Sequence, residues 1–125
     1  MSAPAAAHTA AYRQQSILTA TPGQLVVMLY EGCGRFLRQS AHAMREGRAD
    51  VAHAKWRRAD AILGELLSTL DLEQGGEIAS RLQGIYVFCQ RHLLEAVRDQ
   101  QPAKVDQVIE LLDELREAWT QIAAA

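Results

Sequence analysis

The stretch TPGQLVVMLYEG, residues 21–32, joins the start signal of a helix to an unbroken apolar run. Thr21 is a residue type that caps helices, and Pro22 suits the first helical position. Gln24 completes a capping box of the form Thr-x-x-Gln. The next six residues, 25–30, are all apolar. A helix packed on one core needs only one apolar face, so this helix carries more apolar surface than its own packing requires.

The rest of the chain continues with helical periodicity. Gly47 stops the first helix, Asp50 is a capping type for the second, and Pro102 suits the start of the fourth. Gly75 and Gly76 are expected to provide positive φ angles in the turn before the third helix. The alanines that end the chain are expected to fray. Four helices are therefore predicted, at about residues 21–46, 50–70, 77–99 and 102–122.

Four helices of this length with short connections predict an all-α fold, an antiparallel four-helix bundle. Tyr12 to Leu18 forms a short additional N-terminal helical segment, too short to be a stable helix alone. Residues 1–11 are rich in alanine and are predicted to be a disordered tail. Residues 12–125 are predicted to form a single domain, which suits the length of the chain.

Composition narrows the classes of partner and compartment. The net charge is −2, so there is no excess of basic residues for phosphate contacts and nucleic acid is not an expected partner. No apolar run approaches the ~20 residues of a membrane span, so no membrane insertion is expected. Cys33 and Cys89 stand alone in apolar segments, which is typical of buried thiols in a reducing compartment. Residues 1–11 do not resemble a secretory signal, and a cytosolic location is predicted.

The motifs of common catalytic and cofactor sites are missing from the sequence. There is no GxSxG elbow, no glutamate followed by histidine three residues later, and no CxxCH. The chain is therefore predicted not to be an enzyme and to bind no metal or cofactor. A histidine phosphotransfer module remains an alternative, because His53 is followed by Lys55, Arg57 and Arg58. The plainer interpretation of that run is a solvated helix face.

The excess of apolar residues has two interpretations. One is a thick core with self-association, which would make the chain a structural bundle and a homodimer when no partner is bound. The other is an apolar groove that receives another chain, because contiguous exposed apolar surface marks interaction sites. The second interpretation also explains the apolar residues ahead of the first helix. Tyr12, Ile17 and Leu18 would form a segment that lies in the groove and shields it.

Three segments of the chain share the patterns of one protein family. TATPGQLVVMLYEG, residues 19–32, is similar to that family's TASPxxLxxMLYDG segment. LLSTLDLEQGGEIASRLQGIY, residues 66–86, resembles LxxSLDxxxGGEIAxNLxxLY, and LLDELREAWTQI, residues 111–122, resembles LLxELRxAWxxI. The LD-x-x-x-GGEIA pattern is the most specific of these, and together the segments resemble the FliS family, the flagellin-specific secretion chaperones. The departures are mild, with Thr21, Glu31, Ser80 and Ile85 in place of Ser, Asp, Asn and Leu.

The resemblance implies a chaperone that binds the disordered C-terminal segment of flagellin in the cytosol. Binding in apolar surface grooves would prevent premature polymerisation, and the complex would be delivered to the flagellar export apparatus, a type III secretion system. Trp119 is assigned to the core. For each residue expected to bind the partner, a place in the core is an equally open alternative, because periodicity does not separate the two. The expected partner-binding residues are Leu25, Met28, Leu29, Ile62, Leu66, Leu70, Ile78, Leu82, Ile85 and Tyr86.

Overall fold

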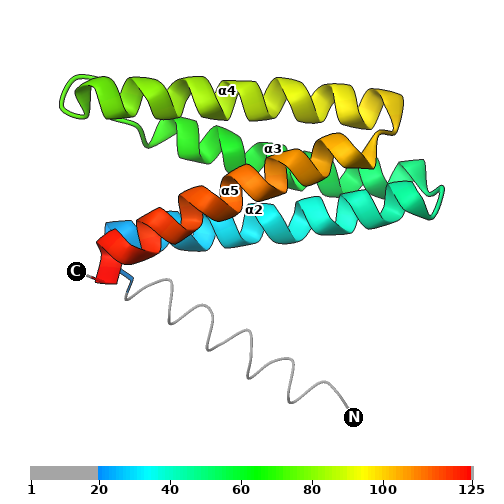
Figure 1. Cartoon of the computed structure of the whole chain (residues 1–125), viewed down its shortest axis with the longest axis horizontal. Coiled ribbons are helices and arrows are strands. Elements are labelled where there is room, and N and C mark those ends of the chain that lie inside the picture. The colour runs from blue at the N-terminus through cyan, green and yellow to red at the C-terminus, as the bar shows by residue number, and fades with distance from the viewer. Residues whose placement is uncertain (1–19, 125) are drawn as a thin grey trace, which may run out of the picture.

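A computed structural model describes the backbone of residues 20–124 and the side chains of residues 20–121. This part of the chain consists of α2 (Pro22–Arg45), α3 (Ala49–Ser68), α4 (Gly76–Asp99) and α5 (Pro102–Ala124). Consecutive helices run in opposite directions, so the loops alternate between the two ends of the molecule (Figure 1). The predicted four-helix bundle is thus confirmed. The predicted tail and the additional N-terminal segment lie outside the described residues.

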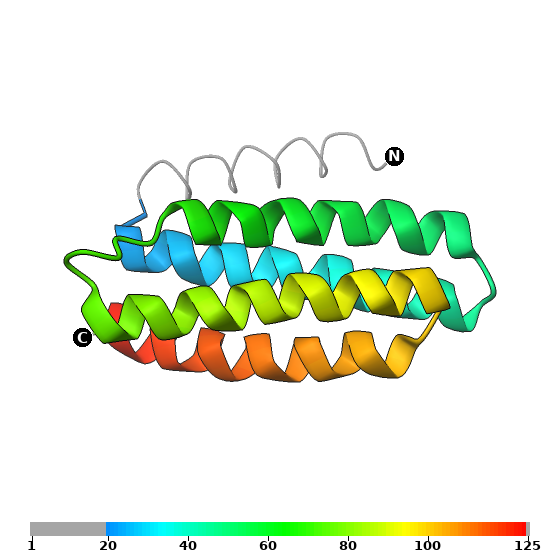
Figure 2. The same ribbon diagram turned by 90° about the horizontal axis from the view of Figure 1, so that it is seen from above.

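The four helices form a ring in which α2 and α4 occupy opposite corners (Figure 2). The packing is closest where α2 meets α3 and α5, and it is looser around α4. The buried face of α2 explains this difference, because it carries small residues such as Gly32, Gly34, Ser40 and Ala41. Small side chains let neighbouring helix axes approach one another.

The core contains side chains from all four helices. Leu37, Leu63, Leu93 and Leu112 are fully buried and contribute one leucine from each helix. Cys33 and Cys89 are buried free thiols, as their sequence context indicated. None of the helices within the described residues is both long enough and apolar enough to cross a bilayer.

The start of α2 follows the sequence prediction. The hydroxyl oxygen Oγ1 of Thr21 accepts a hydrogen bond from the backbone N–H of Gln24 at 3.2 Å. In return, Oε1 of Gln24 accepts one from the backbone N–H of Thr21 at 2.9 Å. The capping box is therefore complete, and it sets the position at which the apolar run begins.

The start of α3 differs from the prediction that Asp50 would cap it. The capping position is Arg48, whose side chain makes no capping hydrogen bond, and Asp50 lies in the first turn. The turn after α2 accounts for the shift, because the N–H of Arg48 donates to the carbonyl of Ala43 at 2.8 Å. The carbonyl of Arg48 then accepts from the N–H of Ala52 at 3.0 Å, which is the first hydrogen bond of the helix. Asp50 still favours the helix electrostatically from its first turn.

The two glycines before α4 serve different purposes. Gly76 has a φ of +53°, as predicted, but Gly75 has a φ of −75° and the prediction of a positive angle there is wrong. Gly75 is instead constrained by space. A Cβ at this position would lie 2.6 Å from both the carbonyl oxygen of Asp71 and the Cβ of Ala79. The loop closes tightly because the Asp71 carboxylate accepts hydrogen bonds from the backbone N–H groups of Glu73 and Gln74.

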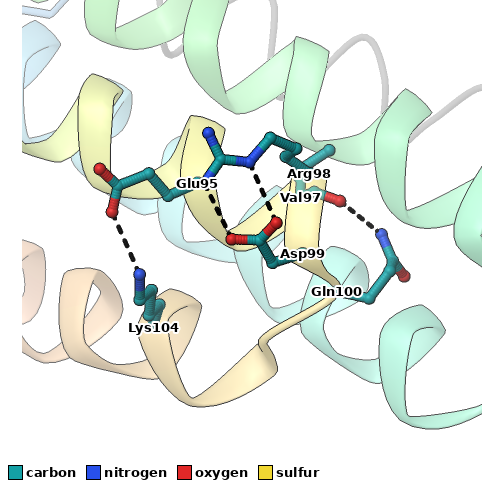
Figure 3. A network of polar contacts seen from close by, with 6 residues as sticks. All are labelled: Glu95, Val97, Arg98, Asp99, Gln100 and Lys104. Carbon is teal, nitrogen blue, oxygen red and sulfur yellow. Dashed lines mark hydrogen bonds and ion pairs between the residues drawn. The ribbon is translucent and has the colours of Figure 1, made fainter.

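The corner between α4 and α5 is held by polar contacts (Figure 3). Gln100 adopts a left-handed φ of 51°, and its side-chain amide donates to the carbonyl of Val97 at 2.7 Å. Lys104 on α5 pairs with Glu95 on α4 at 3.1 Å and lowers the pKa of that carboxyl. The α5 helix begins at Pro102 as predicted, but it extends through Ala124. Helix through these alanines agrees with the high helix propensity of alanine.

Candidate binding groove

A groove of about 560 Å³ opens where α2 begins and α3 ends. Its volume lies within the range of small-ligand and peptide pockets. Most of its lining is apolar, with Glu65 and Thr69 as the polar exceptions. We call this feature the apolar groove, and it is lined by Pro22, Leu25, Val26, Met28, Leu29, Glu65, Leu66, Thr69, Leu70, Tyr86 and Trp119.

The apolar run of α2 supplies one wall of this groove. Tyr30 points into the core and is buried, whereas Val26 and Leu29 are half-buried and pack against the core. Leu25 is 37% exposed and is not among the residues packed on the core. Successive residues of a helix point about 100° apart, so six apolar residues in a row cannot all face inward. The run therefore completes the core with one part and lines the groove with the rest.

The floor of the groove includes Tyr86, which reaches across the bundle from α4. Its hydroxyl is hydrogen-bonded to the hydroxyl of Tyr30 on α2, and both side chains are buried. Burial raises the pKa of both phenols, so both remain protonated at neutral pH. The pair links the two helices that occupy opposite corners of the bundle. Neutral phenols beneath an apolar surface favour binding over acid–base chemistry.

Of the two polar side chains at the rim, Thr69 is engaged within α3, because its hydroxyl donates to the carbonyl of Leu66 at 2.8 Å. The hydroxyl of Ser68 donates to the backbone carbonyl of Glu65 at 2.8 Å and lies 3.4 Å from the carboxylate of that residue, which is exposed. Apolar contact is therefore the main form of recognition that the groove offers.

A protein-family model described as "Flagellar protein FliS" matches residues 4–125. This chain belongs to the FliS family. A similar protein of Vibrio cholerae, named "Flagellar secretion chaperone FliS", is 34% identical over 116 residues, which cover 90% of this chain and 85% of the relative. Relatives with the same name come from Campylobacter jejuni, 34% identical over 112 residues with 90% and 88% covered, and Bacillus subtilis, 32% over 111 residues with 89% and 82% covered.

In this FliS family member, only part of the expected partner-binding set meets in the groove. The residues that line it are Leu25, Met28, Leu29, Leu66, Leu70 and Tyr86. Ile62, Leu82 and Ile85 are half-buried and pack against the core instead. Ile78 is 73% exposed near the start of α4 and does not line the groove. The expected shielding residues Tyr12, Ile17 and Leu18 lie outside the described residues.

Five groove residues were not among those expected from the sequence: Pro22, Val26, Glu65, Thr69 and Trp119. Trp119 had been assigned to the core, and it does pack against the core while one side lines the groove. Pro22 and Thr69 flank the ends of α2 and α3, and no periodic signal marks such positions as lining. His53, the candidate for phosphotransfer, is exposed on α3 outside the groove, with its ring centre 5.1 Å from that of Trp56.

Proposed function

We propose that this chain is a flagellar secretion chaperone that binds the C-terminal segment of flagellin in the cytosol. The apolar residues of that segment would occupy the apolar groove until the complex reaches the flagellar export apparatus. The observation that carries this proposal is the groove itself, an apolar surface on a bundle that already has a complete core. Membership of the FliS family supports it, because relatives are named flagellar secretion chaperones.

The energetics of a disordered partner favour a surface of this kind. Ordering such a segment costs ~2–5 kcal/mol or more, which is offset by burying on the order of 1,000–3,000 Å². The groove accounts for one part of that area. Val87, Phe88 and Leu94 are exposed apolar side chains on α4 that offer further contact area to a long segment. Covering the apolar residues of flagellin in this way would keep them from assembling before export, and no catalytic step is required.

The residues ahead of α2 provide a route for release. Pro22 lies at the edge of the groove, and Leu18 precedes it by only four residues. Four residues span at most about 14 Å, so a segment containing Tyr12, Ile17 and Leu18 starts within reach of the groove. A competing segment of the same chain lowers the apparent affinity by the fraction of time that it occupies the site. Such a segment would cover the groove when no partner is bound, and the partner would displace it on binding.

Calorimetry with a flagellin C-terminal peptide tests the proposal. Leu25→Asp is expected to weaken binding at least tenfold, about 1.4 kcal/mol, because it places a charge in the apolar groove. Leu25 is a sharper choice than Leu29, since Leu29 packs against the core and its replacement by aspartate also threatens the fold. Leu72→Asp is the matched control, because Leu72 is 47% exposed in the loop between α3 and α4 and does not line the groove.

Circular dichroism establishes that both variants remain folded. If folded Leu25→Asp binds the peptide as tightly as the unchanged chain, the groove is not the binding site. A stable homodimer that binds no peptide would favour the self-associating structural bundle. Phosphate incorporation at His53 in a phosphoacceptor assay would favour the phosphotransfer alternative.

A further inference from the structure

A second hollow, of about 350 Å³, lies between α2 and α3 near the C-terminal end of α2. We call it the cationic hollow, because cationic side chains dominate its lining. His42 and Glu46 also line it and approach one another to 3.5 Å. It shares no lining residue with the apolar groove, and the helices pack in contact between the two features, where a Cβ at Gly32 would lie 3.5 Å from Cδ1 of Ile62. A ligand in one of them therefore leaves the other open.

Two of the three lysine and arginine side chains in the cationic hollow have no acidic partner. Arg38 on α2 pairs with Asp113 of α5 at 2.9 Å. Arg48 in the connecting turn and Lys55 on α3 make no ion pair with any residue that the structure describes. Unpaired cations on a concave surface create a positive potential, which attracts carboxylates and speeds the association of an acidic partner.

The positive charge continues beyond the hollow along α3. The ammonium of Lys55 lies 6.0 Å from the centre of the half-buried Phe36 ring, and the guanidinium carbon of Arg58 lies 5.9 Å from the same point. Residues 35–58 contain seven Lys or Arg and two Asp or Glu, whereas the rest of the chain contains six and thirteen. The chain therefore concentrates its positive charge around the cationic hollow and is acidic elsewhere.

The shape and the charge of the cationic hollow favour an acidic peptide segment as its ligand. Lys55 is half-buried, and a flat membrane surface would meet the rim of the hollow before it met such a side chain. A nucleic acid carries negative charge along its whole length, which the acidic remainder of the chain would repel. Residues 1–19 contain no Asp or Glu, so the N-terminal segment of this chain is not the acidic ligand. Carboxylates from another protein provide the complementary charge.

We propose that the cationic hollow binds an acidic segment of a protein other than the partner in the apolar groove. Carboxylates of this segment would pair with Arg48 and Lys55, and an apolar side chain beside them would lie against Phe36. Because the two features share no residue, the chain would hold both proteins in one complex. This inference goes beyond the proposed function and does not depend on which protein occupies the groove.

Fluorescence anisotropy with the full chain and two short labelled peptides tests this inference. One peptide has four glutamates among serines, and its counterpart has glutamines at the same positions. The chain is expected to bind the glutamate peptide about tenfold more tightly at low salt, as a few exposed ion pairs would provide, and added salt should weaken this preference. Arg48→Gln/Lys55→Gln should abolish the preference. Arg57→Gln/Arg91→Gln, which removes the same charge outside both features, should retain it.

Four results of this assay overturn the inference: no binding of the glutamate peptide, equal binding of the two peptides, a preference that survives Arg48→Gln/Lys55→Gln in a chain that circular dichroism shows to be folded, or a preference that the control variant also loses. A saturating flagellin C-terminal peptide should leave the binding of the glutamate peptide unchanged, and displacement would overturn the inference as well. If the flagellin peptide does not bind while the glutamate preference appears, the proposed function is wrong and this inference stands.

Two further measurements cover other occupants of the cationic hollow. The chain is expected not to sediment with vesicles made of equal parts phosphatidylcholine and phosphatidylserine. Sedimentation with these vesicles that Arg48→Gln/Lys55→Gln abolishes would identify a membrane surface as the ligand and overturn the inference. Sedimentation velocity of the chain alone should show no association that depends on Arg48 and Lys55. A dimer that the double substitution dissociates would identify a second copy of this chain as the occupant.

Discussion

At the scale of single residues, the Tyr30–Tyr86 pair connects the core to the floor of the groove. The two hydroxyls bond to each other across the bundle, and replacing one leaves the other buried without that partner. Tyr30→Phe and Tyr86→Phe are each expected to lower the free energy of unfolding by about 1 kcal/mol. The double variant should cost little more than either single one, because it leaves no orphaned hydroxyl. Urea denaturation of the four proteins measures this coupling, and additive losses would contradict it.

The two thiols predict how stability depends on pH. Burial raises the pKa of Cys33 to about 12 and that of Cys89 to about 11, whereas an unfolded thiol titrates near ~8.5. Above that unfolded value the unfolded chain loses protons that the folded chain keeps, so the free energy of unfolding falls as pH rises. The expected loss by pH 10 is about 1–2 kcal/mol per thiol.

Denaturation at pH 7 and pH 10 measures this dependence. Cys33→Ala/Cys89→Ala removes both groups and should show a smaller loss between the two pH values. The same loss in both proteins would mean that the thiols are not responsible. Thiol reagents at pH 8 should also react slowly with the folded chain and quickly once it is unfolded.

At the scale of elements, replacing three glycines by alanine distinguishes the effect of helix propensity on stability from the effect of loop geometry. Gly64 in α3 and Gly84 in α4 have open space where a Cβ would be placed, so alanine at either position should raise the free energy of unfolding by up to about 1 kcal/mol. Gly75→Ala should lower it by about 1–3 kcal/mol, because its Cβ would collide with the Asp71 carbonyl. Urea denaturation gives all three values, and a stabilising Gly75→Ala would contradict the steric explanation of this loop.

The helices themselves were predictable because their signals are local. The capping box at Thr21 and the proline that starts α5 act within a single turn of helix, and the structure confirms both. The start of α3 was not predictable in the same way. A backbone hydrogen bond in the preceding turn places Arg48 at the capping position. That bond depends on the geometry of the turn, so the residues around Asp50 do not indicate it.

At the scale of the whole molecule, the buried core of the described residues runs from Tyr30 to Leu112 and draws on all four helices. Deleting residues 1–18 is therefore expected to leave a folded bundle whose helical circular dichroism is unchanged. If those residues shield the groove, the shortened chain should bind more of an apolar dye. Leu25→Asp in the shortened chain should reduce that binding, because Leu25 lines the groove. Loss of the helical signal on deletion would show that residues 1–18 belong to the fold.

The sequence by itself determined four helices, their antiparallel order, and the surplus of apolar residues at the start of α2. These properties depend on periodicity, capping and loop length, which act over a few residues. Only the tertiary structure decided that Leu25 faces the groove while Tyr30 bonds to Tyr86, and that Trp119 lines the same surface. It also brought Phe36 beside Lys55 and Arg58. The physical reason is that a groove exists where several helices meet, so which side chains line it depends on packing between residues far apart in the chain.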